Sequence, residues 1–120
     1  LVTRADSRLF HMRAFNGWVK ATQIAELDPD TTTSHRNSTA PLRVLDLACG
    51  KGGDLGKWTL HKRGILRYVG IDVARGSLED AAARALKMRN KLKNVVFCCA
   101  DLGSDVPGRR RCHLLTWRMK

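Results

Sequence analysis

The sequence predicts a partial doubly wound, Rossmann-like α/β fold, because three features of such folds occur in order along the chain. Short apolar runs at 42–48, 67–73 and 94–101 are typical of strands buried in a parallel sheet. Segments with helical composition separate these runs, and a glycine-rich loop directly follows the first. Alternating strands and helices imply parallel crossover connections, which build a doubly wound sheet.

The region before the first strand is predicted to hold one helix and one exposed loop. Phe15 and Trp18 recur near helical spacing in the stretch Arg13–Leu27. The helix is expected to end there, because the proline after Asp28 disfavours helical backbone in that residue. Polar residues dominate 28–41, which we therefore predict to be a loop.

Two helices are predicted between the strands. The first covers Asp54–Arg63 and ends at Gly64, a residue suited to the position after a helix C-terminus. The second covers the alanine-rich segment Ser77–Asn90, with Ser77 as its N-cap and two acidic residues in its first turn.

The regular pattern stops after the third strand. A doubly wound sheet has about six strands, so the C-terminal half of the fold is expected to be missing or divergent. We predict one truncated domain with four parts: an N-terminal helical segment (1–27), a polar loop (28–41), a βαβαβ core (42–101) and a basic divergent tail (102–120).

The charge balance favours a polyanionic partner. The net charge is +11, from 22 Lys and Arg against 11 Asp and Glu. Such a surface suits RNA, DNA or a nucleotide polyphosphate, although a merely soluble basic protein has the same composition.

The four cysteines show no C-x-x-C spacing and no paired histidines, so no metal site is expected. They indicate a reducing, intracellular compartment. No run approaches the ~18 apolar residues of a membrane span, and the start lacks the pattern of a signal peptide.

The glycine-rich loop lies in "LDLACGKGGDL", Leu45–Leu55. It is not a P-loop, because Gly50 and Gly56 enclose five residues and Lys57 is not followed by Ser or Thr. A dinucleotide fingerprint lacks its third glycine, since Leu55 occupies that position. A loop that seats S-adenosylmethionine remains, in which an acidic residue precedes the turn.

Each of the three predicted strands carries a carboxylate at or near its carboxyl end. Asp46 precedes the turn and is placed to bind the methionine part of S-adenosylmethionine. Asp72 is placed to accept hydrogen bonds from the ribose hydroxyls, and Asp101 from the adenine amino group. Any one of them could simply cap a turn, but the three together with the loop favour a cofactor site.

Two motifs resemble those of the eukaryotic mRNA cap guanine-N7 methyltransferases. "FHMRAFNGWVKATQI" is similar to that family's "LRNFNNWxK", and "VLDLACGKGGDLGKW" to its "VLDLGCGKGGDLxKW". The resemblance covers about Ser7–Asp101. It implies an S-adenosylmethionine-dependent methyltransferase fold and transfer of a methyl group to N7 of the cap guanine during mRNA processing. It also implies a nuclear location, with the capped 5′ end of mRNA and other capping proteins as partners.

The resemblance assigns the site residues by position. Those implied to bind S-adenosylmethionine are Lys20, Asp46, Ala48, Gly50, Asp72 and Asp101. Those implied to bind the cap are Asn16, Gly17 and Lys51, the last facing the cap phosphates. No catalytic residue is expected, because N7 already carries a free lone pair and the enzyme only positions the reactants. Cys49 has no histidine neighbour in the sequence, so we interpret it as a packed thiol.

The sequence departs from the family at three places. Ala48 stands where the family has Gly, and Gly17 where it has a second Asn. The tail "GRRRCHLLTWRMK" does not match the family, so we expect a fragment, or the product of an altered frame or splice, with weak or no activity alone.

Two other functions remain open from the sequence. A non-catalytic basic RNA-binding protein on a partial α/β scaffold would bind RNA regardless of its cap. An oxidoreductase that uses a nicotinamide cofactor is disfavoured by the incomplete glycine pattern.

Overall fold

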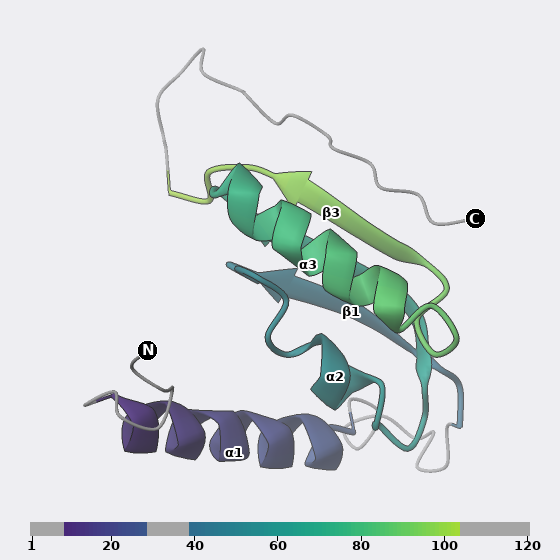
Figure 1. The fold of residues 1–120 in the computed structure, drawn as a ribbon. Helices are drawn as coiled ribbons and strands as arrows, with labels where there is room; N and C mark the ends of the chain where they lie inside the picture. The colour runs from purple at the N-terminus through teal and green to yellow at the C-terminus, as the bar shows by residue number, and fades with distance from the viewer. Residues whose placement is uncertain (1–8, 29–38, 104–120) are drawn as a thin grey trace. The chain divides into compact units, whose positions relative to one another are not determined.

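A computed structural model describes residues 9–28 and 39–103 of this protein. The chain divides into two compact units, Leu1–Ser38 and Thr39–Lys120, and each is described by itself. Figure 1 shows the elements of both units and their order along the chain.

The described residues of the first unit, 9–28, form the helix α1 (Phe10–Glu26). It begins three residues before the predicted start, and the Arg13 amide donates to the Leu9 carbonyl at 2.9 Å. It ends one residue before the predicted end, because Leu27 already has extended backbone with ψ of 118°. No side chain of α1 is buried, and the aromatic rings of Phe15 and Trp18 lie 6.1 Å apart on one face.

The second unit is built on a parallel sheet of the three predicted strands. They are β1 (Leu42–Leu47), β2 (Ile65–Asp72) and β3 (Val95–Cys99), in the order β1-β2-β3. The predicted strands are therefore confirmed, with boundaries that differ by one or two residues.

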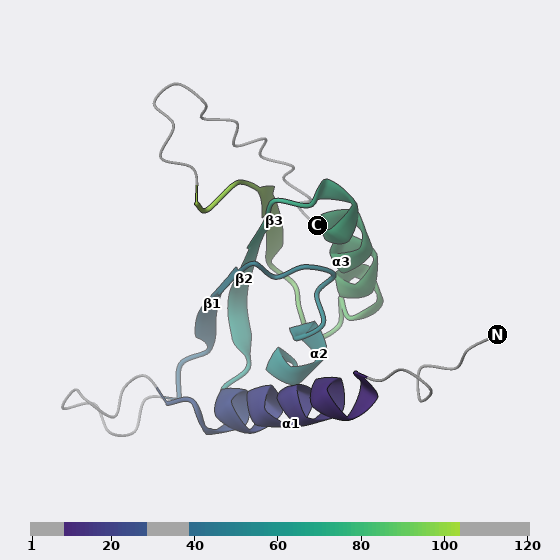
Figure 2. The same cartoon turned by 90° about the vertical axis from the view of Figure 1, so that its left-hand side faces the viewer.

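Two helices cover one face of this sheet, as Figure 2 shows. α2 (Leu55–Trp58) follows β1 and α3 (Arg75–Lys87) follows β2, which gives the predicted βαβαβ order. Both lie on the same face because successive right-handed crossovers to neighbouring strands return on one side. The buried core between helices and sheet comprises Leu42, Val44, Leu55, Tyr68, Leu78, Ala81, Ala85, Leu92, Val95 and Phe97.

The helix predicted over 54–63 is wrong in length, because only Leu55–Trp58 is helical. Thr59 donates from its hydroxyl to the Gly56 carbonyl at 2.7 Å, and the chain continues in tight turns. His61 is buried, and Gly64 has a φ of +68°, so this glycine closes a turn before β2.

The predicted N-cap at Ser77 is also wrong. α3 begins at Arg75, with Ala74 as the residue before it, and ends at Lys87, three residues before the predicted end. The Asp72 carboxylate accepts a hydrogen bond from the Ala74 amide at 2.8 Å, which fixes the start of the helix two residues early. Ser77 lies inside the first turn and donates its amide to the Ala74 carbonyl.

The other face of the sheet carries apolar side chains from all three strands. Successive residues of a strand point to opposite faces, so the alternation with buried Val44 places Leu45 and Leu47 on this second face. They are 62% and 56% exposed. In the described part of this unit, both helices of the crossovers lie on the first face.

Candidate cofactor-binding site

The glycine-rich loop turns sharply over the carboxyl ends of the strands. Its backbone has positive φ at Ala48 (57°), Gly50 (53°) and Gly52 (69°). The Cys49 amide donates to the Ile71 carbonyl at 3.0 Å, which ties the loop to β2. Three left-handed residues at alternate positions explain why glycine dominates the stretch. Ala48 is the exception, because its Cβ makes this conformation unfavourable.

Gly52 packs directly against α3. A Cβ built on it would lie 2.6 Å from Leu55 Cδ1 and 3.1 Å from the Ala81 Cβ. By contrast, a Cβ on Gly50 or Gly53 would meet nothing within 4 Å. The loop is therefore fixed to the helix layer at Gly52 and open at the two glycines on either side.

Asp72 connects the loop to the helix that follows it. Its Oδ2 accepts from the Gly50 amide at 2.8 Å, and its Oδ1 accepts from the Ala74 amide at 2.8 Å. The predicted ribose-binding carboxylate thus has a structural role as well. A carboxylate has about four acceptor positions, so these two bonds leave acceptor capacity for hydroxyl groups.

Asp46 is held by a buried tyrosine that sequence reasoning missed. The Tyr68 hydroxyl donates to Asp46 Oδ2 at 2.5 Å, and the Tyr68 side chain is fully buried. Burial, followed by this hydrogen bond and the negative charge of Asp46, raises the pKa of Tyr68 well above its ordinary value. The phenol therefore stays protonated and keeps one carboxylate oxygen of Asp46 in place. The sequence feature that could have indicated this contact is a tyrosine inside an apolar strand, because a buried tyrosine hydroxyl usually needs a hydrogen-bond partner.

Asp101 lies just beyond β3 and is exposed. The Ala100 amide donates to the Asp72 carbonyl at 3.0 Å, which brings this segment alongside the end of β2. Among the described residues, the hydrogen bond that Asp101 Oδ1 accepts is a local one, from the Gly103 amide at 2.9 Å. Because the sheet is parallel, Asp46, Asp72 and Asp101 all lie at its carboxyl edge, as the sequence predicts.

Cys49 lies among these carboxylates as a partly buried thiol. Burial, and then the negative charges of Asp46 and Asp72, raise its pKa to about 11. Its sulfur also lies 2.8 Å from where a Cβ on Gly70 would stand, so it fills the space beside β2. A thiol with this pKa is protonated at neutral pH and is a poor nucleophile. The structure thus agrees with the prediction of a packed thiol.

Lys51 projects from the loop toward α3. Its Nζ lies 3.0 Å from Asp80 Oδ2, and both side chains are more than half exposed. An exposed pair of this kind contributes ~0–1 kcal/mol to stability. The lysine can therefore exchange Asp80 for a more highly charged anion.

The remaining predicted residues lie on α1, in the first unit. Asn16 and Lys20 are exposed and Gly17 is half-buried. Asn16 and Lys20 are four residues apart, so they share one helix face. A Cβ on Gly17 would meet nothing within 4 Å. The roles assigned to these three residues stay predictions.

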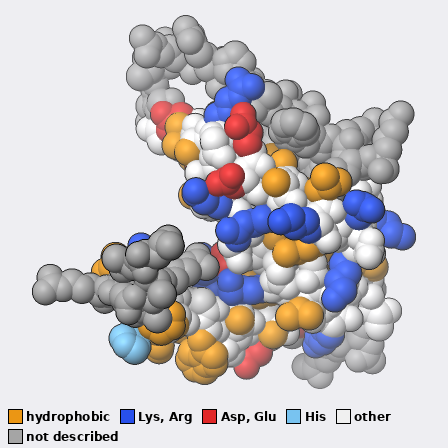
Figure 3. Space-filling view, in the orientation of Figure 1, with side chains coloured by type: hydrophobic (Ala, Val, Ile, Leu, Met, Phe, Trp, Pro, Cys, Tyr) orange, Lys and Arg blue, Asp and Glu red, His pale blue; other side chains and the backbone are white. Residues whose placement is uncertain are grey.

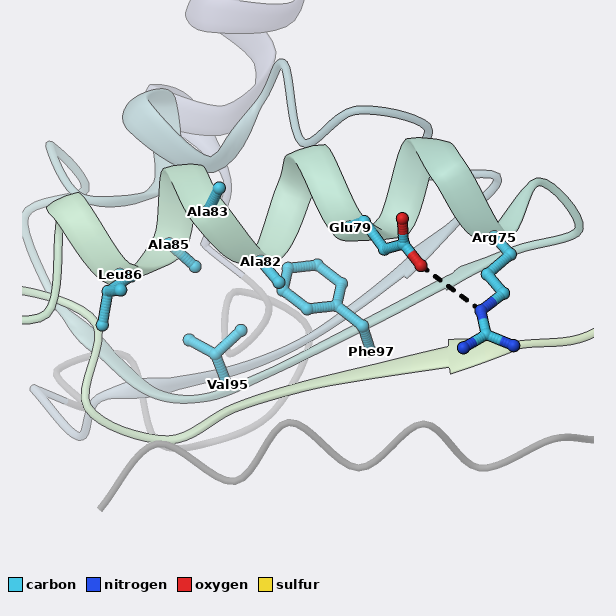
Figure 4. Close-up of a pocket in the computed structure, with 8 residues that line it drawn as sticks. All are labelled: Arg75, Glu79, Ala82, Ala83, Ala85, Leu86, Val95 and Phe97. Atoms are coloured by element: carbon cyan, nitrogen blue, oxygen red, sulfur yellow. Dashed lines mark hydrogen bonds and ion pairs between the residues drawn. The ribbon is translucent and has the colours of Figure 1, made fainter.

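A separate apolar cavity of about 440 Å³ lies between α3 and β3. Figure 4 shows Phe97 and Val95 from the strand facing the alanines of the helix, with the Arg75–Glu79 ion pair at one end. None of the predicted site residues lines it.

Two kinds of feature are absent from the described ranges, 9–28 and 39–103. No group of three or more His, Cys, Asp or Glu residues there is arranged to hold a metal ion. No helix within these ranges has the length and apolar character needed to cross a bilayer.

Comparison with known proteins identifies relatives by sequence. The mRNA cap guanine-N(7) methyltransferase of Aspergillus niger is 42% identical over 87 residues, which is 72% of this chain and 14% of that protein. Those of Caenorhabditis elegans and Schizosaccharomyces pombe are 42% and 40% identical over 102 residues, 85% of this chain and 26% of each relative. The chain therefore spans about a quarter or less of these proteins.

One solved structure, the [4+2]-cyclase SpnF, aligns with a TM-score of 0.49 and 23% identity over 76% of this chain and 29% of its own. Residues 1–108 match the mRNA (guanine-N(7))-methyltransferase domain family, so more than half of the sequence, including the glycine-rich loop and the three carboxylates, is accounted for. The chain belongs to the mRNA (guanine-N(7))-methyltransferase domain family.

Proposed function

We propose that this chain forms the S-adenosylmethionine-binding part of an enzyme that methylates N7 of the guanine cap of mRNA. The observation that carries the proposal is the placement of Asp46, Asp72 and Asp101 at one edge of the sheet, around the glycine-rich loop. The family to which the chain belongs supplies the reaction class.

The residues at this edge suit S-adenosylmethionine. The open space above Gly50 lets a ligand approach the loop backbone closely. Asp46 offers a carboxylate oriented by Tyr68, which suits the ammonium of the methionine part. Asp72 retains acceptor capacity for two ribose hydroxyls, and Asp101 is exposed and can accept from an amino group. Lys20 of the first unit and Ala48 of the glycine-rich loop are proposed as further cofactor contacts.

The chain's own residues are proposed to act by positioning. S-adenosylmethionine supplies the electrophilic methyl group. N7 of guanine supplies a lone pair and carries no proton, so no general base is required. The protonated Cys49 thiol contributes packing in the loop rather than nucleophilic attack.

The cap is proposed to be bound by Lys51, Asn16 and Gly17. Lys51 would exchange its exposed ion pair with Asp80 for the cap phosphates, which carry several negative charges. The capped 5′ end of mRNA is therefore the proposed substrate, the nucleus the proposed location, and other capping proteins the proposed partners.

Calorimetry with S-adenosylmethionine tests the cofactor site. Asp101→Asn is the sharpest variant, because the hydrogen bond that Asp101 accepts within the described residues is local, and losing it leaves the sheet intact. A hydrogen bond to a charged group contributes about 1.5–3 kcal/mol, so its loss should weaken the binding of S-adenosylmethionine by ~10- to 100-fold. Tyr68→Phe is expected to weaken binding by a few-fold, since Asp46 loses its orientation.

Asp80→Asn is the matched control. It removes the same charge from an exposed side chain on α3 that lies outside the three strand ends. Its affinity for S-adenosylmethionine should equal that of the unmodified chain. Equal affinities for Asp101→Asn and Asp80→Asn would refute the assignment of the adenine site.

A further inference from the structure

One stretch of the second unit carries strong positive charge with no acidic residue. Residues 81–100 contain no Asp or Glu, and the five basic side chains among them are all exposed. These residues, called the basic patch below, are Arg84, Lys87, Arg89, Lys91 and Lys93. No carboxylate within the described ranges forms an ion pair with any of them. Figure 3 shows Lys and Arg side chains gathered over this side of the molecule.

The basic patch stands on a fixed framework. Leu78, Ala81 and Ala85 bury the inner face of α3, so Arg84 and Lys87, three residues apart, share its outer face. The turn after α3 is held by Leu92, which is 1% exposed, and by the Asn94 side chain, whose Nδ2 donates to the Leu66 carbonyl at 3.0 Å. The charges therefore keep a defined spacing before any ligand binds.

The basic patch occupies the C-terminal half of α3 and the turn after it, whereas the candidate cofactor site lies at the carboxyl ends of the strands. α3 begins beside the carboxyl ends of the strands, where Asp80 pairs with Lys51, and runs back toward their amino ends. A helix of 13 residues is about 20 Å long. The glycine-rich loop contacts α3 near its middle, where Gly52 packs against Ala81, so the basic patch begins about one helical turn beyond the loop and extends away from it.

We infer that the basic patch binds the phosphodiester backbone of single-stranded RNA, independently of the cap. The choice of RNA among polyanions rests on the proposed function. Residues 81–100 contain a single aromatic side chain, Phe97, which is fully buried and cannot stack on a base. Contacts therefore fall on phosphates and are independent of sequence. The centre of an interface with a protein is depleted of charged residues, whereas this patch holds five exposed cations and one large exposed apolar side chain, Leu86.

Fluorescence anisotropy with an uncapped 20-nucleotide RNA tests the proposal on the full 120-residue chain. With about four phosphates neutralised, log K should fall with log salt at a slope of about −2.8, or ~50-fold between 50 and 200 mM. Arg84→Gln with Lys87→Gln should lower affinity by about tenfold at low salt and make the slope shallower by about 1.4. The factor by which this double variant loses affinity should be the same for a capped and an uncapped RNA.

Arg43→Gln with Arg67→Gln is the matched control. These two arginines are exposed register partners of β1 and β2, on the sheet face opposite α3. The control removes the same charge and should leave the RNA affinity and its salt slope unchanged. Equal losses in both double variants would show a response to net charge alone and overturn the proposal.

Absence of RNA binding by the unmodified chain at 50 mM salt would also overturn it, as would unchanged binding after Arg84→Gln with Lys87→Gln. Circular dichroism and S-adenosylmethionine calorimetry on the same samples separate this proposal from the proposed function. Intact cofactor binding with no RNA binding refutes only the basic patch. RNA binding that follows the pattern above, without cofactor binding, supports the basic patch and refutes the cofactor site.

Discussion

Ala48→Gly should stabilise this protein, although most alanine-to-glycine changes destabilise. Ala48 has a φ of 57°, a conformation that costs an L-residue about 1–2 kcal/mol relative to glycine. Its methyl group is exposed, so removing it loses little packing. Glycine makes the unfolded chain more flexible, which offsets about 0.4–1 kcal/mol of the gain. The net expectation is a stabilisation of ~0.5–1 kcal/mol.

Thermal unfolding followed by circular dichroism measures this effect. A gain of that size raises the midpoint by roughly 2–8 °C for a domain of this size. Ala83→Gly is the control, because Ala83 is an exposed alanine within α3; it should lose about 1 kcal/mol. Ala48→Val should also lower the midpoint, since a branched side chain is still less suited to positive φ. A midpoint for Ala48→Gly at or below that of the parent would refute the backbone argument.

Two further predictions concern the same loop. Gly52→Ala should lower the free energy of unfolding, measured in urea, by about 2–4 kcal/mol, because the new Cβ would stand 2.6 Å from Leu55 Cδ1 and φ is +69°. Gly53→Ala is the control: its Cβ would meet nothing within 4 Å, so it should cost less than about 0.5 kcal/mol. Equal losses in the two variants would contradict the close packing at Gly52. Cys49, with a pKa of about 11, should react with iodoacetamide at pH 8 about 100-fold more slowly than a thiol of ordinary pKa. Rapid alkylation at pH 8 would disprove the raised pKa. The protonated thiol contributes stability that is complete below about pH 9 and is lost as pH rises toward 11. The thermal midpoint of the parent should therefore fall relative to that of Cys49→Ala across this pH range.

The sequence predicted the sheet well because the signals are local. An apolar run of five to eight residues beside a glycine-rich loop has few alternatives to a buried parallel strand. Element boundaries were less accurate where a side chain distant in sequence competes for a backbone group. The start of α3 is the clearest case, because the Asp72 carboxylate binds the Ala74 amide and makes the N-cap at Ser77 unnecessary.

The positions of the three carboxylates of the candidate site could be predicted from the sequence, but their hydrogen-bond partners could not. That Asp46, Asp72 and Asp101 share one edge follows from parallel strands alone. That Asp72 also anchors the loop through the Gly50 amide could not be predicted, since the two residues are 22 positions apart. The contact between Tyr68 and Asp46 spans the same separation and depends on the register of β1 and β2.

The sequence by itself determined the α/β class, the order of the elements, the loop and the residue types at the strand ends, because each depends on local composition and period. Only the tertiary structure decided the sign of φ at Ala48, the burial that raises the pKa of Cys49 and the placement of Arg84 and Lys87 on the outer face of α3. These properties depend on which backbone and side-chain groups meet across strands and helices. Neighbours along the chain do not specify them, and they follow from the register and packing of the whole unit.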